Sequence, residues 1–227
     1  MQGRVKESKV PDWQKVIAAK IALAEKQRAL GNPPSKPSLD ARVPPGQTVV
    51  TNFPILDLGV LPDINKDNWT LRIYGMVQQE LNLDWNAFQA LPQMTDISDF
   101  HCVTRWSKLD MQWDGVSARA LLMQAVPLEN AHYVTLHAYD GYTTNLPLDA
   151  LLDDDVLIAH SALGYPLTTA HGGPVRMVVP KRYAWKSAKW IKAIELHEFD
   201  RPGFWETRGY HNEAFPFEEQ RFTDEDY

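Results

Sequence analysis

The sequence predicts an α+β fold, in which strands outnumber helices and do not alternate with them. Segments rich in β-branched and aromatic residues recur along the chain, whereas few segments have helical periodicity. Neither a repeated βαβ rhythm nor an internal repeat is present, which argues against a doubly wound parallel sheet. A chain of 227 residues is also long enough to bury a substantial core without disulfides.

The first 47 residues differ in pattern from the rest of the chain. Residues 12–30 repeat apolar side chains at helical spacing, and Gly31 is suited to end that helix. Residues 32–47 contain five prolines and no periodicity, as in an extended strap. We therefore predict three parts, namely a helix and Pro-rich strap over 1–47, a main domain over 48–215 and an acidic tail over 216–227.

Strands and short helices are predicted to follow the strap. Asp84 and Ser117 are suited to cap helices over 84–91 and 117–125, and a third short helix is expected over 148–152. The predicted strands, rich in Val, Ile, Tyr and Trp, are 49–53, 69–77, 133–139, 156–160, 175–179 and 189–199. Mixed sheets with short helices are the architecture that this order favours.

Charge is distributed unevenly in a chain whose net charge is −6. The negative total argues against nucleic acid as a partner, because phosphate binding needs a basic surface. Residues 156–194 nevertheless contain no acidic residue, whereas residues 195–227 are strongly acidic. The basic residues of the first stretch are Arg176, Lys181, Arg182, Lys186, Lys189 and Lys192. Such a stretch is either a solvated face or a binding site for an anion.

A single cysteine, Cys102, excludes an intrachain disulfide and a cysteine-based zinc site. The sequence also has no apolar run long enough to span a bilayer, and the N-terminus lacks the apolar core of a secretory signal. We therefore expect a soluble, cytoplasmic protein that is a monomer and has no membrane span.

The segment HCVTRWS, residues 101–107, is the densest group of reactive side chains in the sequence. A thiolate binds soft metals, and a nearby cation such as Arg105 favours the thiolate form. Two other interpretations of Cys102 are an inert buried thiol and a nucleophile that is activated by a distant histidine. The polar neighbours of Cys102 fit poorly with a merely hydrophobic role.

A second group of polar residues combines glycines with basic side chains. His171-Gly172-Gly173 permits close approach of the backbone and leads into a strand with Arg176, and the turn around Ser187 and Lys189 follows. Amides, a hydroxyl and an ammonium group around a turn can hold a phosphate. The pattern matches neither a Walker A loop nor a GxGxxG fingerprint, and a basic surface hairpin is the alternative.

Taken in order, HCVTRWS, WDGV (113–116), DGYTTNLPL (140–148) and HGGPVRMVVPKRYAWKSAKWIKAIEL (171–196) resemble the molybdopterin-binding domain of the sulfite oxidase family. The similarity covers about residues 48–215 and is greatest to short bacterial members related to the methionine sulfoxide reductase catalytic subunit. It implies the fold of that family and a molybdenum ion. One pterin dithiolene, one cysteine thiolate and oxo or hydroxo ligands would hold the metal.

The resemblance assigns residues to the cofactor. Cys102 matches the cysteine that binds the metal, and His171 and Arg176 match positions that contact the pterin. Ser187, Ala188 and Lys189 match the turn that holds its phosphate, and Asn52 and Phe53 lie near another contacting loop.

Catalytic candidates are fewer. Tyr142 lies where the family would place an active-site tyrosine, and Arg105 and Arg182 are candidates for binding an oxyanion substrate by their charge. Trp106 and Trp185 are expected beside the cofactor.

The resemblance implies an enzyme that moves an oxygen atom on or off a small sulfur oxyanion or sulfoxide. A chain with one cysteine has no c-type haem motif, so electrons would be exchanged with a separate haem or flavin protein. The alternatives are a catalytically idle module that binds a pterin or another anion, and a cysteine hydrolase.

Overall fold

The computed structural model describes residues 13–29, 41–59 and 61–223. The chain forms two compact units, Met1–Pro33 with Leu56–Val60, and Pro34–Ile55 with Leu61–Tyr227. Residues 32–40 of the predicted strap and 224–227 of the predicted tail lie outside the described residues.

The first unit contains one helix, α1 (Trp13–Ala29), as the apolar spacing predicts. Gly59, in the segment that belongs to this unit, has a φ of +87°, and a Cβ built there would lie 2.4 Å from Val16 Cγ1. Lys20 Nζ also lies 4.0 Å from a carboxylate oxygen of Asp57. A glycine is therefore needed where the segment passes the helix.

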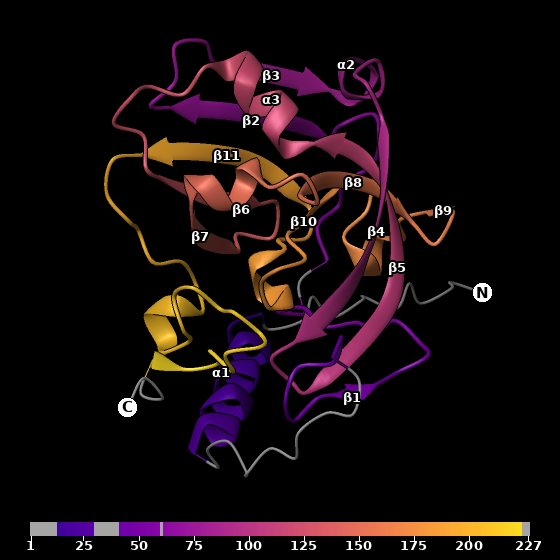
Figure 1. Cartoon of the computed structure of the whole chain (residues 1–227), viewed down its shortest axis with the longest axis vertical. Helices are drawn as coiled ribbons and strands as arrows, with labels where there is room; N and C mark the ends of the chain where they lie inside the picture. The colour runs from indigo at the N-terminus through magenta and orange to yellow at the C-terminus, as the bar shows by residue number, and fades with distance from the viewer. Residues whose placement is uncertain (1–12, 30–40, 60, 224–227) are drawn as a thin grey trace, which may run out of the picture. The chain divides into compact units, whose positions relative to one another are not determined.

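Two mixed sheets build the second unit (Figure 1). The first has the order β1-β5-β8-β10, with β4 paired to β5 and β9 paired to β8. Its strands are β1 (Thr48–Val49), β4 (Met94–Cys102), β5 (Trp106–Ser117), β8 (Leu157–Ala162), β9 (Tyr165–Pro166) and β10 (Arg176–Val178). The second sheet, β3-β2-β11-β6-β7, consists of β2 (Thr70–Gly75), β3 (Leu81–Asp84), β6 (Tyr133–Ala138), β7 (Thr143–Pro147) and β11 (Ile191–His197).

The helices of this unit are short. The predicted caps are confirmed, because the Asp84 side chain accepts from Ala87 N at the start of α2 (Trp85–Gln89), and Ser117 accepts from Ala120 N at the start of α3 (Ala118–Ala125). The remaining short helices are 3₁₀ turns, namely η1 (Leu148–Leu152), η2 (Thr169–His171), η3 (Ala184–Lys186) and η4 (Glu206–Arg208).

The long hairpin of β4 and β5 has no counterpart among the predicted strands. It pairs Met94 with Gly115 at one end and Cys102 with Trp106 at the other. The predicted strand over 49–53 is wrong in extent, since β1 ends at Val49. These differences matter for function, because the hairpin carries the cysteine.

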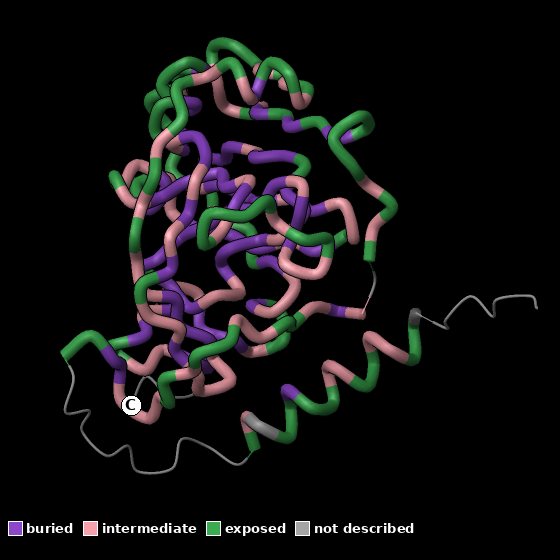
Figure 2. Tube along the Cα trace, turned by 90° about the vertical axis from the view of Figure 1, so that its right-hand side faces the viewer, coloured by how far each residue is buried: buried purple, intermediate pink, exposed green. Residues whose placement is uncertain are grey.

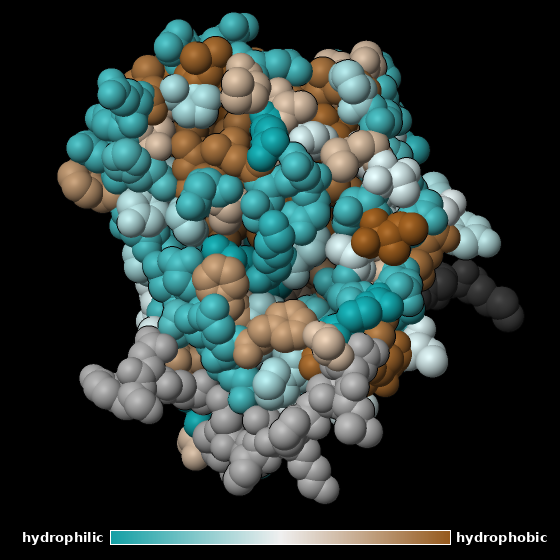
Figure 3. Space-filling view, viewed as in Figure 1, coloured by the Kyte–Doolittle hydropathy of each residue, from teal (hydrophilic) through white to brown (hydrophobic). Residues whose placement is uncertain are grey.

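The core of the first sheet combines aromatic and aliphatic side chains. Phe100, Met111 and Trp113 of the hairpin pack with Leu157, Ala159 and Val178. In Figure 2, buried residues are concentrated in the middle of the second unit, whereas most of the described residues of α1 are exposed or half-buried. Figure 3 shows hydrophobic side chains in the upper part of the view, where Figure 1 places α3, and Met123 of that helix is exposed. Among the described residues, no helix is long and apolar enough to cross a bilayer.

Candidate cofactor and active site

Cys102 is the last residue of β4, beside a tight turn. Val103, Thr104 and Arg105 connect β4 to β5, and Arg105 has a φ of +71°, the left-handed position of a three-residue hairpin loop. Arg105 N donates to Cys102 O at 3.0 Å, which closes the turn. The cysteine is thus held by the rigid end of a hairpin.

The sulfur of Cys102 has polar neighbours although it is buried. Thr104 Oγ1 lies 3.1 Å from Cys102 Sγ, within hydrogen-bond distance. Burial raises the pKa of the Cys102 thiol, while Thr104 and the positive charge of Arg221 lower it. Burial has the largest effect, so the pKa of the thiol lies above its ordinary value, and the contact with Thr104 Oγ1 is the one that a purely hydrophobic environment would lack.

Within the glycine–basic group of the sequence, the stretch around Gly172 packs directly on the turn around Lys189. Lys189 Nζ donates to Ala170 O at 2.6 Å, and Trp190 Nε1 donates to Thr169 O at 2.8 Å. Gly172 has a φ of +99°, and a Cβ there would lie 2.9 Å from Lys189 Cβ. The glycine therefore permits the approach that brings the basic side chains together.

Arg176 is a buried cation at the centre of this contact. Its guanidinium donates to three backbone carbonyls, those of His171 at 2.9 Å, Ser187 at 3.0 Å and Met177 at 3.3 Å. Its other neighbours are three aromatic rings, Phe53, Phe100 and Trp113, at 5.9, 5.4 and 5.5 Å from its central carbon. Burial lowers the pKa of Arg176 to about 9, so it is still cationic at neutral pH.

His171 and Phe53 form a stacked pair, with ring centres 4.4 Å apart. His171 Nε2 lies 3.1 Å from Phe53 O, and Nδ1 lies 3.0 Å from Thr168 Oγ1. Phe53 also packs against Trp106, so this pair connects the glycine turn to the cysteine hairpin. Asn52, the other predicted residue of this loop, is exposed.

The predicted phosphate turn uses part of its polar groups internally. Ser187 Oγ accepts from Val179 N at 2.9 Å, and the carbonyl of Ala188 accepts from Met177 N at 2.8 Å. Ser187 and Ala188 are buried, whereas Lys189 is half-buried. The Ser187 hydroxyl hydrogen and the Lys189 ammonium group are the donors that this turn can offer an anion.

Two predicted catalytic residues have partners away from the cysteine turn. Tyr142 is buried, and its hydroxyl donates to Trp185 O at 2.7 Å. Arg182 lies on the ring of Phe215, 3.5 Å from its centre, and donates to Glu213 at 3.4 Å. Tyr142 is thus connected to the site by its hydrogen bond to Trp185, whereas Arg182 contacts the C-terminal segment.

The structure adds neighbours of Cys102 that the sequence analysis missed. Arg221 Nη1 donates to Val103 O at 2.8 Å, and its guanidinium lies over Tyr183, 4.8 Å from the ring centre. Burial and the negative charge that Cys102 can carry raise the pKa of Tyr210. Trp185 lies between the two tyrosines, stacked on Tyr183 at 5.4 Å and edge-on to Tyr210 at 5.1 Å. The C-terminal segment is recognisable in the sequence only by its acidic composition, which does not predict that Tyr210 and Arg221 lie near Cys102.

These residues fit an anionic cofactor attached to Cys102. Among the described residues, no carboxylate pairs with Arg176, and a buried cation of this kind is costly without an anion. Trp106 Nε1, across the hairpin from Cys102, is buried and has no hydrogen-bond partner in the described part of the chain. A thiol, a cation and a free donor are the groups that a metal with an anionic organic ligand would use.

Comparison with known proteins defines the class. Residues 58–205 match the family described as oxidoreductase molybdopterin binding domain. The chain belongs to this family, the sulfite oxidase family of molybdopterin-binding oxidoreductases, and the prediction of its family and α+β fold is confirmed.

Individual relatives agree with this assignment. The chain is 46% identical over 185 residues to the uncharacterized oxidoreductase YuiH of Bacillus subtilis (strain 168), an alignment covering 80% of this chain and 92% of that protein. It is 30% identical over 155 residues to the protein-methionine-sulfoxide reductase catalytic subunit MsrP of Gluconobacter oxydans (strain 621H), covering 60% of this chain and 49% of that protein. The sulfane dehydrogenase SoxCD from Paracoccus pantotrophus shares the fold, with a TM-score of 0.56 and 20% identity over 61% of this chain and 40% of that one.

Proposed function

We propose that this protein binds one molybdenum–pterin cofactor through Cys102 and catalyses oxygen-atom transfer on a small sulfur oxyanion or sulfoxide. The observation that carries the proposal is Arg176, a buried cation whose hydrogen bonds go to backbone carbonyls. Its guanidinium lies 5.4 Å from the ring of Phe100, two residues from Cys102. An anion bound between the glycine turn and the cysteine hairpin would neutralise it.

The side chains divide between holding the metal and holding the pterin. Cys102 is the proposed ligand, and the Thr104 hydroxyl orients and tunes its sulfur by a hydrogen bond. Arg176 and Lys189 supply donors and positive charge to the pterin and its phosphate, His171 packs beside the pterin, and the Ser187 hydroxyl and the Ala188 backbone complete that turn. Asn52 and Phe53 border the same loop.

When bound, the cofactor supplies the two-electron chemistry of oxygen-atom transfer, and the protein supplies binding, orientation and charge. In this proposal Arg105 attracts an anionic substrate to the cysteine turn, and Tyr142 supports the site by its hydrogen bond to Trp185 O. Arg182, the other predicted oxyanion ligand, pairs with Glu213 and has a structural role in the C-terminal segment. Trp106 and Trp185 exclude water beside the cofactor.

The substrate and the partner are proposed from the relatives. One relative is named a methionine sulfoxide reductase catalytic subunit and a structural neighbour a sulfane dehydrogenase, and both names refer to sulfur chemistry. The word subunit also supports electron exchange with a separate haem or flavin protein. We propose a monomer that works in the cytoplasm on a small-molecule substrate.

The test is turnover of the purified protein with two probes, methionine sulfoxide with a reduced viologen dye, and sulfite with an oxidising dye. We expect one probe to be turned over by the wild type and neither by Cys102→Ser. Bound cofactor without turnover in either assay would favour an idle binding module. Acylation of Cys102 by an ester substrate, with no metal present, would favour a cysteine hydrolase.

A further inference from the structure

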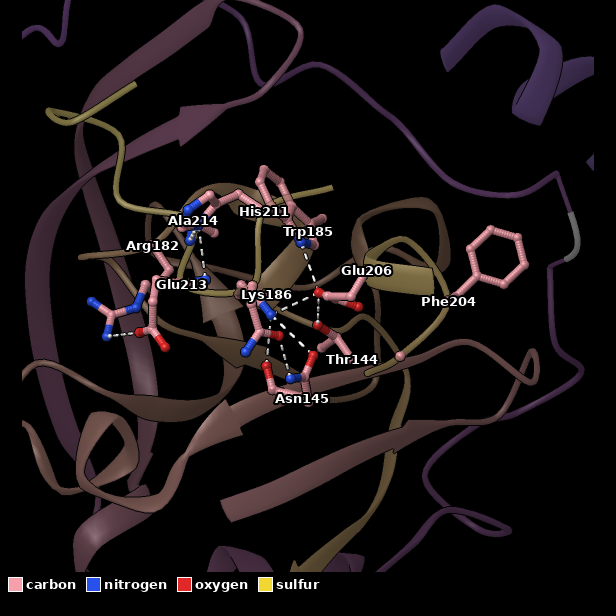
Figure 4. Close-up of polar contacts among 12 residues, drawn as sticks. Thr144, Asn145, Arg182, Trp185, Lys186, Phe204, Glu206, His211, Glu213 and Ala214 are labelled. Atoms are coloured by element: carbon pink, nitrogen blue, oxygen red, sulfur yellow. Dashed lines mark hydrogen bonds and ion pairs between the residues drawn. The ribbon is translucent and has the colours of Figure 1, made fainter. Parts of the chain in front are cut away.

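Lys186 follows the site residue Trp185 in the chain, and its side chain is wholly buried. Its Nζ lies 2.7 Å from Glu206 Oε1 and donates to the backbone and side-chain oxygens of Asn145 at 2.8 and 3.2 Å (Figure 4). Burial lowers the pKa of Lys186, and Glu206 opposes this shift. The pair joins η3, which precedes the proposed phosphate turn, to η4 in the C-terminal segment.

Glu206 concentrates its hydrogen bonds on one oxygen. Besides Lys186, its Oε1 accepts from Trp185 Nε1 at 2.9 Å and from Thr144 Oγ1 at 2.8 Å. The other oxygen, Oε2, is buried and has no hydrogen-bond partner among the described residues. The side chain is therefore arranged to hold its neighbours in place, although its own desolvation is incompletely compensated.

Trp185 connects this pair to Cys102. Its ring is stacked on Tyr183 and edge-on to Tyr210, and its carbonyl accepts the hydrogen bond of Tyr142. Tyr183 in turn lies under Arg221, which donates to Val103 beside the cysteine. Any rotation of the Trp185 ring would therefore disturb the aromatic side chains next to the proposed metal ligand.

Stability alone does not explain this arrangement. Replacing a buried ion pair by well-packed apolar residues of similar volume is often neutral or stabilising. An apolar residue at position 206, however, could not accept the indole N–H of Trp185. Of the contacts that need an oxygen at this position, those to Lys186, Thr144 and Trp185, the one to Trp185 involves a residue of the site.

We propose that Glu206, held by Lys186, is a positioning residue that fixes Trp185 and thereby Tyr142 and Tyr210 relative to Cys102. The inference rests on the proposed function, because it concerns the orientation of residues that would face the cofactor. It assigns no contact between Glu206 and the substrate.

A matched pair of double variants separates charge from orientation. Both K186M/E206Q and K186M/E206L remove the two charges, but only the glutamine retains an oxygen that can accept the indole N–H. R119M/D154L, which removes an ion pair at the protein surface, is the control. If K186M/E206L does not fold, K186M/E206M replaces it with a side chain closer in shape to glutamate.

Two readouts are needed on the purified, cofactor-loaded proteins. The first is the Trp185 indole N–H resonance in protein labelled with ¹⁵N-tryptophan, assigned with W185F. The second is kcat and KM with the active probe, at equal molybdenum content. We expect the glutamine variant to keep the resonance and kcat close to the wild type. In the leucine variant the resonance should move upfield and kcat fall about tenfold to a hundredfold, with KM little changed.

Equal kcat and an equal indole resonance in both double variants would overturn the proposal, since the oxygen would then position nothing. Equal losses in both would also overturn it, because charge rather than orientation would be responsible. If the wild type turns over neither probe, the proposed function fails, and the indole resonance together with the Mo(V) electron paramagnetic resonance signal still decides the positioning.

Discussion

Arg176 and Arg182 are two buried arginines on either side of a short turn, with different neighbours. Arg176 is 3% exposed and donates to backbone carbonyls, whereas Arg182 is 7% exposed and donates to the carboxylate of Glu213. Arg176 faces the cysteine hairpin through Phe100, and Arg182 faces Phe215 in the C-terminal segment. The protein thus pairs Arg182 with its own carboxylate, whereas no carboxylate among the described residues pairs with Arg176.

This difference shows how two residues with similar burial can have separate roles. The cost of burying a charge is offset by an opposite charge, wherever that charge comes from. For Arg182 the protein supplies it, which agrees with a structural contact. For Arg176 the described residues do not, which agrees with a cofactor site.

The largest expected difference between the two arginines is in cofactor retention. We expect Arg176→Met to lose most of the molybdenum found in the wild type, because the cofactor loses its buried counter-charge, whereas Arg182→Met retains it. Elemental analysis of the two purified variants is the measurement. Equal molybdenum contents would show that the two cations are equivalent for binding.

A smaller difference is expected in stability without cofactor. Arg176→Met removes a charge that has no anion in the described structure, so the variant should be as stable as the wild type or up to about 4 kcal/mol more stable. Arg182→Met loses the contacts to Phe215 and Glu213 and should be about 1 kcal/mol less stable. Urea unfolding of cofactor-free protein measures both. A strongly destabilised Arg176→Met would mean that its carbonyl and ring contacts outweigh its desolvation.

The smallest expected difference is in the titration of His171. Burial is the main cause that lowers its pKa below 6.5, and Lys189 and Arg176 lower it further. In cofactor-free protein the unfolded chain therefore binds the proton first, and stability falls as the pH drops below about 6.5. Arg176→Met should raise the pKa of His171 and make that fall shallower, and Arg182→Met should not. An NMR titration of the histidine measures this pKa, and identical curves for the two variants would show that the charge of Arg176 does not affect the titration of His171.

The comparison also explains what could be predicted from the sequence. Local signals identified the caps Asp84 and Ser117 and the glycine–arginine segment, because each depends on neighbours in the chain. The β4–β5 hairpin was missed because the apolar residues Met94, Ile97 and Phe100 of β4 are three positions apart and do not alternate with polar ones. Arg221 was missed because its hydrogen bond to Val103 crosses 118 residues of sequence, and no local pattern records such a contact. Family resemblance supplied the cysteine and the cofactor, and their roles are still predictions.

The most direct test of the central claim is X-ray absorption at the molybdenum edge of the purified wild type, with metal content measured on the same sample. The account predicts about one molybdenum per chain, with sulfur neighbours from one dithiolene and one further thiolate. Dithiolene sulfurs alone, or a Cys102→Ser protein with the same metal content and spectrum, would contradict it.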